Sequence, residues 1–173
     1  ETEDQLLAQA TKNSERMVYP FAVSLASSDK ATGKAVLPEY SNDKQIKDSI
    51  ETKNYLSIES ATLPLPELVE SSRGLGHIAA NRDEDGVIRR VPLLVRHEGS
   101  LVPSLAFQAV LTWLDVSPEQ VEANGSAILL KQAKLPGNKD QIDILIPVDS
   151  QGQMLINYAG KWSETFKHAS FAS

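Results

Sequence analysis

An acidic stretch at residues 81–86, Asn-Arg-Asp-Glu-Asp-Gly, contains side chains whose spacing matches known metal chemistry. Oxygen-bearing side chains at alternate positions before a glycine form the first half of a calcium-binding EF loop. The match then fails, because the ninth position is Arg89 and the twelfth is Pro92, where a bidentate Glu is required. Neighbouring arginines would also repel a cation. We therefore predict an acidic turn and no metal site.

The histidines, serines and glycines give no catalytic motif. His77, His97 and His168 lack the spacing of a zinc site. No serine occupies a Gly-x-Ser-x-Gly elbow, and Ser104 is explained as a helix N-cap. The Gly-Leu-Gly at 74–76 lacks the third glycine of a dinucleotide-binding loop. We predict no enzymatic activity and no cofactor.

Arg89 is the charged residue that needs an explanation. In the alternating segment 87–95 it shares a face with apolar residues, so we expect it to be buried and paired with a carboxylate. Two interpretations remain open. Either Arg89 pairs with Asp85 or Asp83 and fixes a hairpin, or one of Arg89 and Arg90 holds an anionic ligand bidentately. His97 either tunes a pH response or is a surface or capping residue. The candidate ligand-binding residues are Arg89, Arg90 and His97.

The elements that position these side chains lie between residues 74 and 113. Residues 77–80 and 87–95 flank Asp-Gly, a strong hairpin signal. Pro92 cannot donate a ladder hydrogen bond, so we expect an edge or a bulge there. Residues 105–114 are nearly all apolar, with only Gln108 and Thr112 polar, which predicts a helix covered on most sides.

The rest of the chain predicts further helices and strands. Helices are predicted at 1–13, with Leu6, Leu7 and Ala10 on its apolar side, at 63–74, and as a short helix from a capping-box-like start at Ser117 to a stop at Asn124-Gly125. Strands are predicted at 16–26 (buried), 35–37, 55–58 and 127–131, with a closing hairpin formed by 142–148 and 153–158. Residues 42–53 predict a solvated helix or a mobile loop, with a ligand-gated or partner-facing segment as the alternative.

Together these elements predict a mixed α/β (α+β) fold. We expect one domain over residues 1–173, with a central mixed, largely antiparallel sheet and helices packed on it. A net charge of −6 argues against nucleic acid as a partner. The absence of cysteine excludes disulfides and thiolate sites. No apolar run approaches the ~18–20 residues of a spanning helix.

The central stretch resembles a known family, the type-two CHASE domain. That family is an extracytoplasmic sensory domain of bacterial membrane receptors. Its pattern is Leu-Gly, then Asp-x-Asp-Gly-x-x-Arg-x-x-Pro-Leu, then Pro-Ser-Leu-Ala. The positions of this sequence that match it include Gly76, Asp83, Asp85, Gly86, Arg89, Pro92, Pro103 and Ser104. Segments at 4–8, 65–68 and 146–158 are similar to the family's first helix, its Pro-containing helix and its closing hairpin.

The resemblance implies a periplasmic signal-sensing domain of an inner-membrane receptor, without catalysis of its own. The implied output is a histidine kinase of a two-component system, a nucleotide cyclase, a Ser/Thr kinase or a diguanylate cyclase. The implied partner is a small ligand or a periplasmic protein, with membrane contact through flanking helices. Strand–helix units typical of the family do not precede Glu1, so we expect a fragment with an exposed sheet edge and a possible homodimer. A ligand-independent dimerisation or docking module and a stand-alone hydrolase are the alternatives.

Overall fold

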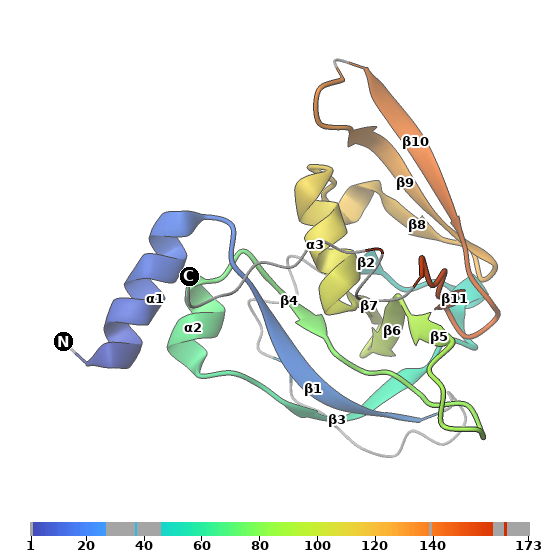
Figure 1. The fold of residues 1–173 in the computed structure, drawn as a ribbon, viewed down its shortest axis with the longest axis horizontal. Helices are drawn as coiled ribbons and strands as arrows, with labels where there is room; N and C mark the ends of the chain where they lie inside the picture. Colours follow the sequence, from blue (N-terminus) through green and yellow to red (C-terminus); the bar gives the residue numbers. More distant parts are fainter. Residues whose placement is uncertain (1, 27–36, 38–45, 139, 161–164, 166–173) are drawn as a thin grey trace.

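The structure is a computed structural model that describes residues 2–26, 37, 46–138, 140–160 and 165. Its helices are α1 (Glu3–Ser14), α2 (Pro66–Ser71) and α3 (Leu105–Trp113), with 3₁₀ turns at Ile50–Thr52 and Pro118–Gln120. The strands are β1 (Val18–Ala26), β2 (Ile46–Lys47), β3 (Ser57–Thr62), β4 (Gly74–His77), β5 (Arg90–Pro92), β6 (Leu94–His97), β7 (Ser100–Pro103), β8 (Val121–Ala123), β9 (Ala127–Lys134), β10 (Gln141–Pro147) and β11 (Gln153–Leu155). Figure 1 shows their arrangement.

A mixed six-stranded sheet is the centre of the fold, in the order β2-β7-β6-β3-β1-β4. The β3/β6 and β1/β4 pairs are parallel, and its other pairs are antiparallel. Two small antiparallel sheets, β10-β9-β8 and β11-β5, accompany it. The predicted fold class, mixed α/β with a largely antiparallel sheet and packed helices, is confirmed.

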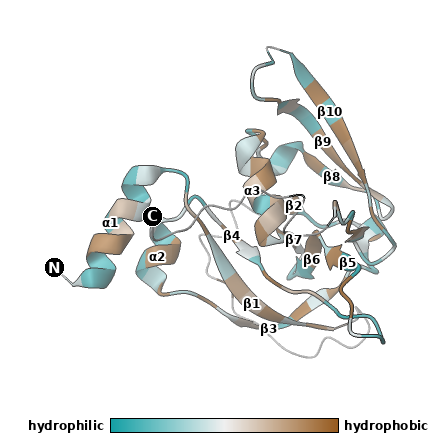
Figure 2. Ribbon diagram, viewed as in Figure 1, coloured by the Kyte–Doolittle hydropathy of each residue, from teal (hydrophilic) through white to brown (hydrophobic). Residues whose placement is uncertain are grey.

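The central sheet curls back on itself, because an isolated parallel bridge joins His77 at the end of β4 to Ser104 just after β7. Side chains therefore divide between two apolar cores, one on each face. The inner core is Phe21, Leu56, Ile58, Val95 and Val102. The outer core, beneath α3, includes Leu94, Leu101, Phe107 and Leu111. Alternation along β6 and β7 produces this division, and Figure 2 shows the apolar stripes on β1 and α3.

The hairpin predicted around Asp85-Gly86 is wrong, although its turn forms. Gly86 N–H donates to the Asp83 carbonyl at 2.8 Å, and the φ of Gly86 is 83°, which suits glycine. Of the strand predicted at 77–80, only His77 lies in a strand, at the end of β4, which pairs in parallel with β1. The strand predicted at 87–95 is divided into β5 and β6, which belong to different sheets.

Leu93 is the point where the chain crosses between these sheets. Its N–H donates to the Gly152 carbonyl at 3.0 Å, and its carbonyl accepts from Ser104 N–H at 2.8 Å. Pro92, just before it, has no N–H, so the strand cannot continue one ladder through this position. The irregularity predicted at Pro92 is confirmed, and it is large enough to separate two sheets.

The predicted closing hairpin is also wrong. β10 pairs with β9 over most of its length, and β11 pairs with β5. The turn at 149–152 forms, since Gly152 N–H donates to the Asp149 carbonyl at 3.0 Å. This turn redirects the chain from one small sheet to another.

Helices α1 and α3 form where predicted, but more of their apolar side chains are exposed to solvent than expected. Thr2 and Gln5 build a capping box for α1. Its buried residues are Ala8 and Thr11, whereas Leu6 and Leu7 are about half exposed. In α3 only Phe107 and Leu111 are buried, and Val110 and Trp113 are exposed. The expected apolar face of α1 and the expected cover of α3 on most sides are therefore wrong.

The remaining predicted elements are shifted or shortened. The helix predicted at 63–74 is α2, and the strand predicted at 55–58 is β3. The short helix predicted from Ser117 is only a 3₁₀ turn, because strand β8 begins at Val121. The buried strand predicted at 16–26 is β1, of which only Phe21 is buried. Within 46–53 a short strand and a 3₁₀ turn replace the predicted helix or loop. Except for Leu37, the strand predicted at 35–37 lies outside the described residues, as do residues 42–45.

Candidate functional site

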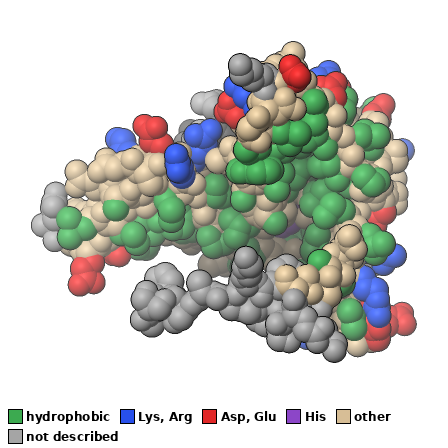
Figure 3. All heavy atoms as spheres, turned by 45° about the horizontal axis from the view of Figure 1, so that its top comes forward, with side chains coloured by type: hydrophobic (Ala, Val, Ile, Leu, Met, Phe, Trp, Pro, Cys, Tyr) green, Lys and Arg blue, Asp and Glu red, His purple; other side chains and the backbone are tan. Residues whose placement is uncertain are grey.

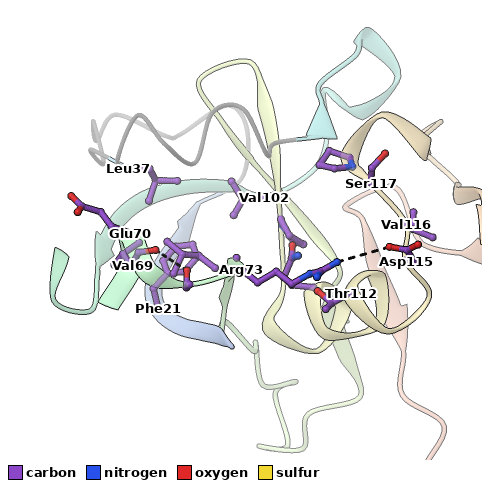
Figure 4. Close-up of a pocket in the computed structure, with 16 residues that line it drawn as sticks. Phe21, Leu37, Val69, Glu70, Arg73, Val102, Thr112, Asp115, Val116 and Ser117 are labelled. Atoms are coloured by element: carbon purple, nitrogen blue, oxygen red, sulfur yellow. Dashed lines mark hydrogen bonds and ion pairs between the residues drawn. The ribbon is translucent and has the colours of Figure 1, made fainter. Parts of the chain in front are cut away.

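A groove of about 590 Å³ opens between α3, the end of α2 and the inner face of the curled sheet. Figure 4 shows that it has two different ends. Phe21, Val69 and Leu37 lie at one end, and Thr112, Asp115 and Ser117 lie at the other. This volume is within the range of small-molecule sites, roughly 300–1,000 Å³.

The apolar end of the groove is continuous with the inner core. Phe21 is 3% exposed and Val69 is 2% exposed, so both are fixed by packing. Leu75 joins them from β4, where it lies beside Tyr19 of β1 in the parallel register. An occupant of this end would contact rigid apolar side chains.

The polar end is crossed by Arg73, which follows α2 and extends toward α3 (Figure 4). Its Nη2 atom is 3.9 Å from an Asp115 carboxylate oxygen, and its Nη1 donates to the Glu15 carbonyl at 3.4 Å. Both contacts are long for a guanidinium. Asp115 has a closer partner, Lys134, whose Nζ is 2.6 Å from the other carboxylate oxygen. Lys134, and secondarily Arg73, lowers the pKa of Asp115 below its usual value.

Gln108 and Thr112 complete this end from α3. They are four residues apart, so they lie on one face of the helix. Within the described parts of the chain, neither side chain makes a hydrogen bond with another residue. The amide and the hydroxyl therefore offer donors and acceptors to the groove.

Two glycines of β4 allow α3 to pack closely against that strand. A Cβ on Gly76 would be 2.3 Å from the Leu105 Cα atom, where no side chain fits. A Cβ on Gly74 would meet only the end of the Gln108 side chain, at 3.0 Å. The 74–76 motif thus serves helix–strand packing, and it makes room for Gln108.

His77 lies beside Phe21 in the β1/β4 register and is 1% exposed. Its Nδ1 accepts from Ala79 N–H at 3.3 Å, so the Nε2 atom carries the proton of the neutral ring. Among the described residues that Nε2 has no partner. Burial lowers the pKa of His77 to about 4.

Arg89 forms the predicted pair with both carboxylates of the acidic turn. Its guanidinium is 2.9 Å from Asp83 and 2.9 and 2.7 Å from the two oxygens of Asp85. Hydrogen bonds from Arg89 lower the pKa of Asp85, and these carboxylates raise the pKa of Arg89. The expected burial is wrong, because Arg89 is 44% exposed. The cause is that residue 89 precedes β5 and belongs to no sheet.

The other two candidate ligand-binding residues lie apart from the groove. Arg90 is half exposed, with Nη1 3.9 Å from Asp83. His97 is 8% exposed, so a surface position is wrong, and burial lowers its pKa. His97 is opposite Ser100 in the β6/β7 register, four residues from Ser104. The arrangement of His97, Ser104 and an Asp that would support a hydrolase is therefore not formed.

Arg73 is the groove residue that sequence reasoning missed. Gln108 and Thr112 carried a signal, because they are the polar positions of an otherwise apolar helix. Arg73 carried none, since an Arg after a short helix is ordinary. Ser104 caps α3 as predicted, with its Oγ accepting from Phe107 N–H at 3.3 Å.

The described residues contain no group of three or more His, Cys, Asp or Glu side chains that could hold a metal ion. None of the helices in the described ranges has both the length and the apolar character needed to cross a membrane.

The fold is a mixed α/β domain in which the motif residues Gly76, Asp85 and Ser104 provide close packing, a turn and a helix cap. The chain belongs to the CHASE2 domain family, whose sequence model matches residues 1–173. This is a family of sensory domains, generally of extracytoplasmic receptors, and not of catalytic domains. The suspected family resemblance is confirmed. No curated protein and no solved structure matched the chain.

Proposed function

We propose that this chain is the extracytoplasmic, periplasmic sensing domain of a bacterial inner-membrane receptor. A ligand or a periplasmic protein binds it, and the change is relayed through membrane helices to a histidine kinase, nucleotide cyclase, Ser/Thr kinase or diguanylate cyclase. The groove in a member of a sensory family is the observation that carries the proposal. No reaction takes place in the domain.

The groove is well placed to affect the first helix. Arg73 contacts the Glu15 carbonyl at the end of α1, and its backbone N–H donates to the Met17 carbonyl at 2.8 Å. An occupant that binds Arg73 would alter contacts at the junction of α1 and β1. A ligand shifts a conformational equilibrium only by its difference in affinity for the two states. Here that difference would come from the Arg73 contacts.

The arginines beside the acidic turn are a second location for an anion, as predicted for Arg89 or Arg90. There an anion must displace Asp83 and Asp85 from Arg89. At Arg73 it would replace only long contacts. The groove is for this reason the better-supported site.

A thermal-shift screen of the 173-residue chain against small anions, metabolites and divalent cations tests the proposal. A ligand that binds only the folded state raises the melting temperature with concentration. We expect the rise to be lost in a folded Arg73→Ala variant and kept in Arg89→Ala. Loss in Arg89→Ala alone would move the site to the acidic turn. No shift with any compound or with periplasmic extract would contradict the sensing proposal.

A ligand-independent dimerisation or docking module is the second candidate, and exposed apolar side chains favour it. Figure 3 shows apolar side chains over much of one face, with charged residues mainly around its edge. Trp113 and Leu145 are 63% and 65% exposed, and Leu6 is 52% exposed. Sedimentation equilibrium of the wild-type chain and of Leu145→Ser separates the candidates. A tight dimer without ligand, lost in the variant, would favour docking.

A further inference from the structure

We propose that the groove binds a small molecule with one carboxylate on an apolar body, and that Arg73 holds the carboxylate. This inference rests on the proposed sensing function and names the class of ligand. A peptide terminus, an amine and a neutral apolar compound are the competing occupants, and the test below distinguishes them.

The two ends of the groove require different parts of one molecule. The end beneath Phe21, Val69 and Leu75 is apolar and buried, so it favours a hydrocarbon or aromatic group. The other end presents the Arg73 guanidinium. Burial of the apolar body would supply affinity, and the charged group would fix its orientation.

The charges at the polar end select an anion. Asp115 is neutralised by Lys134 at 2.6 Å, which leaves Arg73 as the excess positive charge among the described residues of the lining. Glu70, the other acidic residue of that described lining, lies at the opposite end with its carboxylate directed outward (Figure 4). An ammonium group near Arg73 would be repelled.

A carboxylate fits the donors better than a single point charge does. The guanidinium has a fork of N–H donors that binds two carboxylate oxygens side by side. The Gln108 amide and the Thr112 hydroxyl, one helical turn apart, provide further donors beside it. Gly74 leaves the space into which the Gln108 side chain reaches.

The test compares octanoate, octylamine and 1-octanol on the 173-residue chain by isothermal titration calorimetry at low ionic strength. These probes share the apolar body and differ in the head group. We expect octanoate to bind at least ~10-fold more tightly than either of the others. Butanoate should bind more weakly than octanoate, because it buries less apolar surface. Equal binding of octanoate and octylamine would overturn the proposal.

Variants then locate the carboxylate. Arg73→Gln should weaken octanoate at least ~10-fold and leave 1-octanol unchanged, whereas Arg73→Lys should be intermediate. Arg89→Gln is the matched control, since it removes a guanidinium outside the groove and should change neither affinity. Octanoate affinity that is the same in Arg73→Gln as in the wild-type chain would overturn the assignment.

Failure of this inference differs from failure of the sensing function. Tighter binding of N-acetyl-Gly-Leu than of octanoate would overturn the small-molecule occupant in favour of a peptide terminus. A ligand from the general screen that lacks a carboxylate would overturn the inference and leave sensing intact. Octanoate binding that requires Arg73 supports the inference, whatever the receptor output. A receptor carrying this domain whose output does not change when ligand is added would contradict the sensing function alone.

Discussion

Acidification should destabilise this protein through His77 well before its carboxylates titrate. The His77 ring is held neutral by burial, with a pKa of about 4 against an ordinary value of 6.5. In the unfolded chain the ring takes up a proton as the pH falls below 6.5, so the unfolded state binds more protons. Stability is therefore fully present above pH 6.5 and is lost progressively as the pH falls toward 4.

The difference between the two pKa values sets the size of the effect. The extra proton uptake by His77 in the unfolded state, integrated from pH 7 to pH 5, lowers the free energy of unfolding by about 2 kcal/mol. Urea denaturation at both pH values measures this loss for the wild-type chain. In His77→Gln, which cannot titrate, we expect the loss to be smaller by about the same amount. Comparison of the two proteins cancels the contributions of His97 and the carboxylates.

Direct titration keeps the prediction testable if His77→Gln does not fold. The ring resonances of His77 followed by NMR should show a midpoint near 4, or no titration before the protein unfolds. A midpoint at or above 6.5 in the folded protein would refute the reasoning, because it would mean that the buried ring finds a partner for its charged form.

Three further predictions concern packing and charge, each measured by urea or thermal denaturation. Gly76→Ala should destabilise by at least ~2 kcal/mol, because its Cβ meets the Leu105 backbone, whereas Gly74→Ala should cost less than ~1 kcal/mol; equal costs would contradict the packing role. Tyr55→Phe should change stability by less than ~1 kcal/mol, since the buried Tyr55 hydroxyl makes no hydrogen bond of good geometry with the described residues, although the Gly125 backbone lies near enough to interact with it; a large loss would show that the Gly125 contact is a strong hydrogen bond. Arg89→Ala should lower the melting temperature slightly, and less at high salt; a large, salt-independent loss would mean that Arg89 acts through packing.

Local signals in the sequence predicted local structure well. The Ser104 cap, the capping-box start at Ser117 and the Asp83–Gly86 turn all form, because each depends on residues within four positions of one another. The Arg89 pair is also local, spanning four positions to Asp85 and six to Asp83. Its burial was predicted wrongly, since burial depends on which sheet the strand joins.

Strand pairing was predicted poorly for a physical reason. A turn at Asp85-Gly86 brings its flanks close, but it does not oblige them to pair when each flank has a longer-range partner. β4 pairs with β1, more than fifty residues earlier, and β5 pairs with β11, some sixty residues later. Alternation in 87–95 was likewise interpreted as one strand, although Pro92 supplies the break that lets Leu93 cross between sheets.

The same distinction explains why the family motif identifies the fold but not the ligand. Gly76 admits α3, Pro92 separates two sheets, and Ser104 starts the helix that walls the groove, so these residues build the scaffold. Arg73 and Gln108, the polar residues best placed to bind a ligand, lie outside that pattern. They line the same groove because β4 packs against α3. Leu75 and Pro103 of the motif also line the groove, but its polar lining residues stand outside the motif, so a change of Arg73 should alter which ligand binds and leave the fold intact. A change of Gly76 should do the reverse, lowering stability without changing the order of preference among ligands.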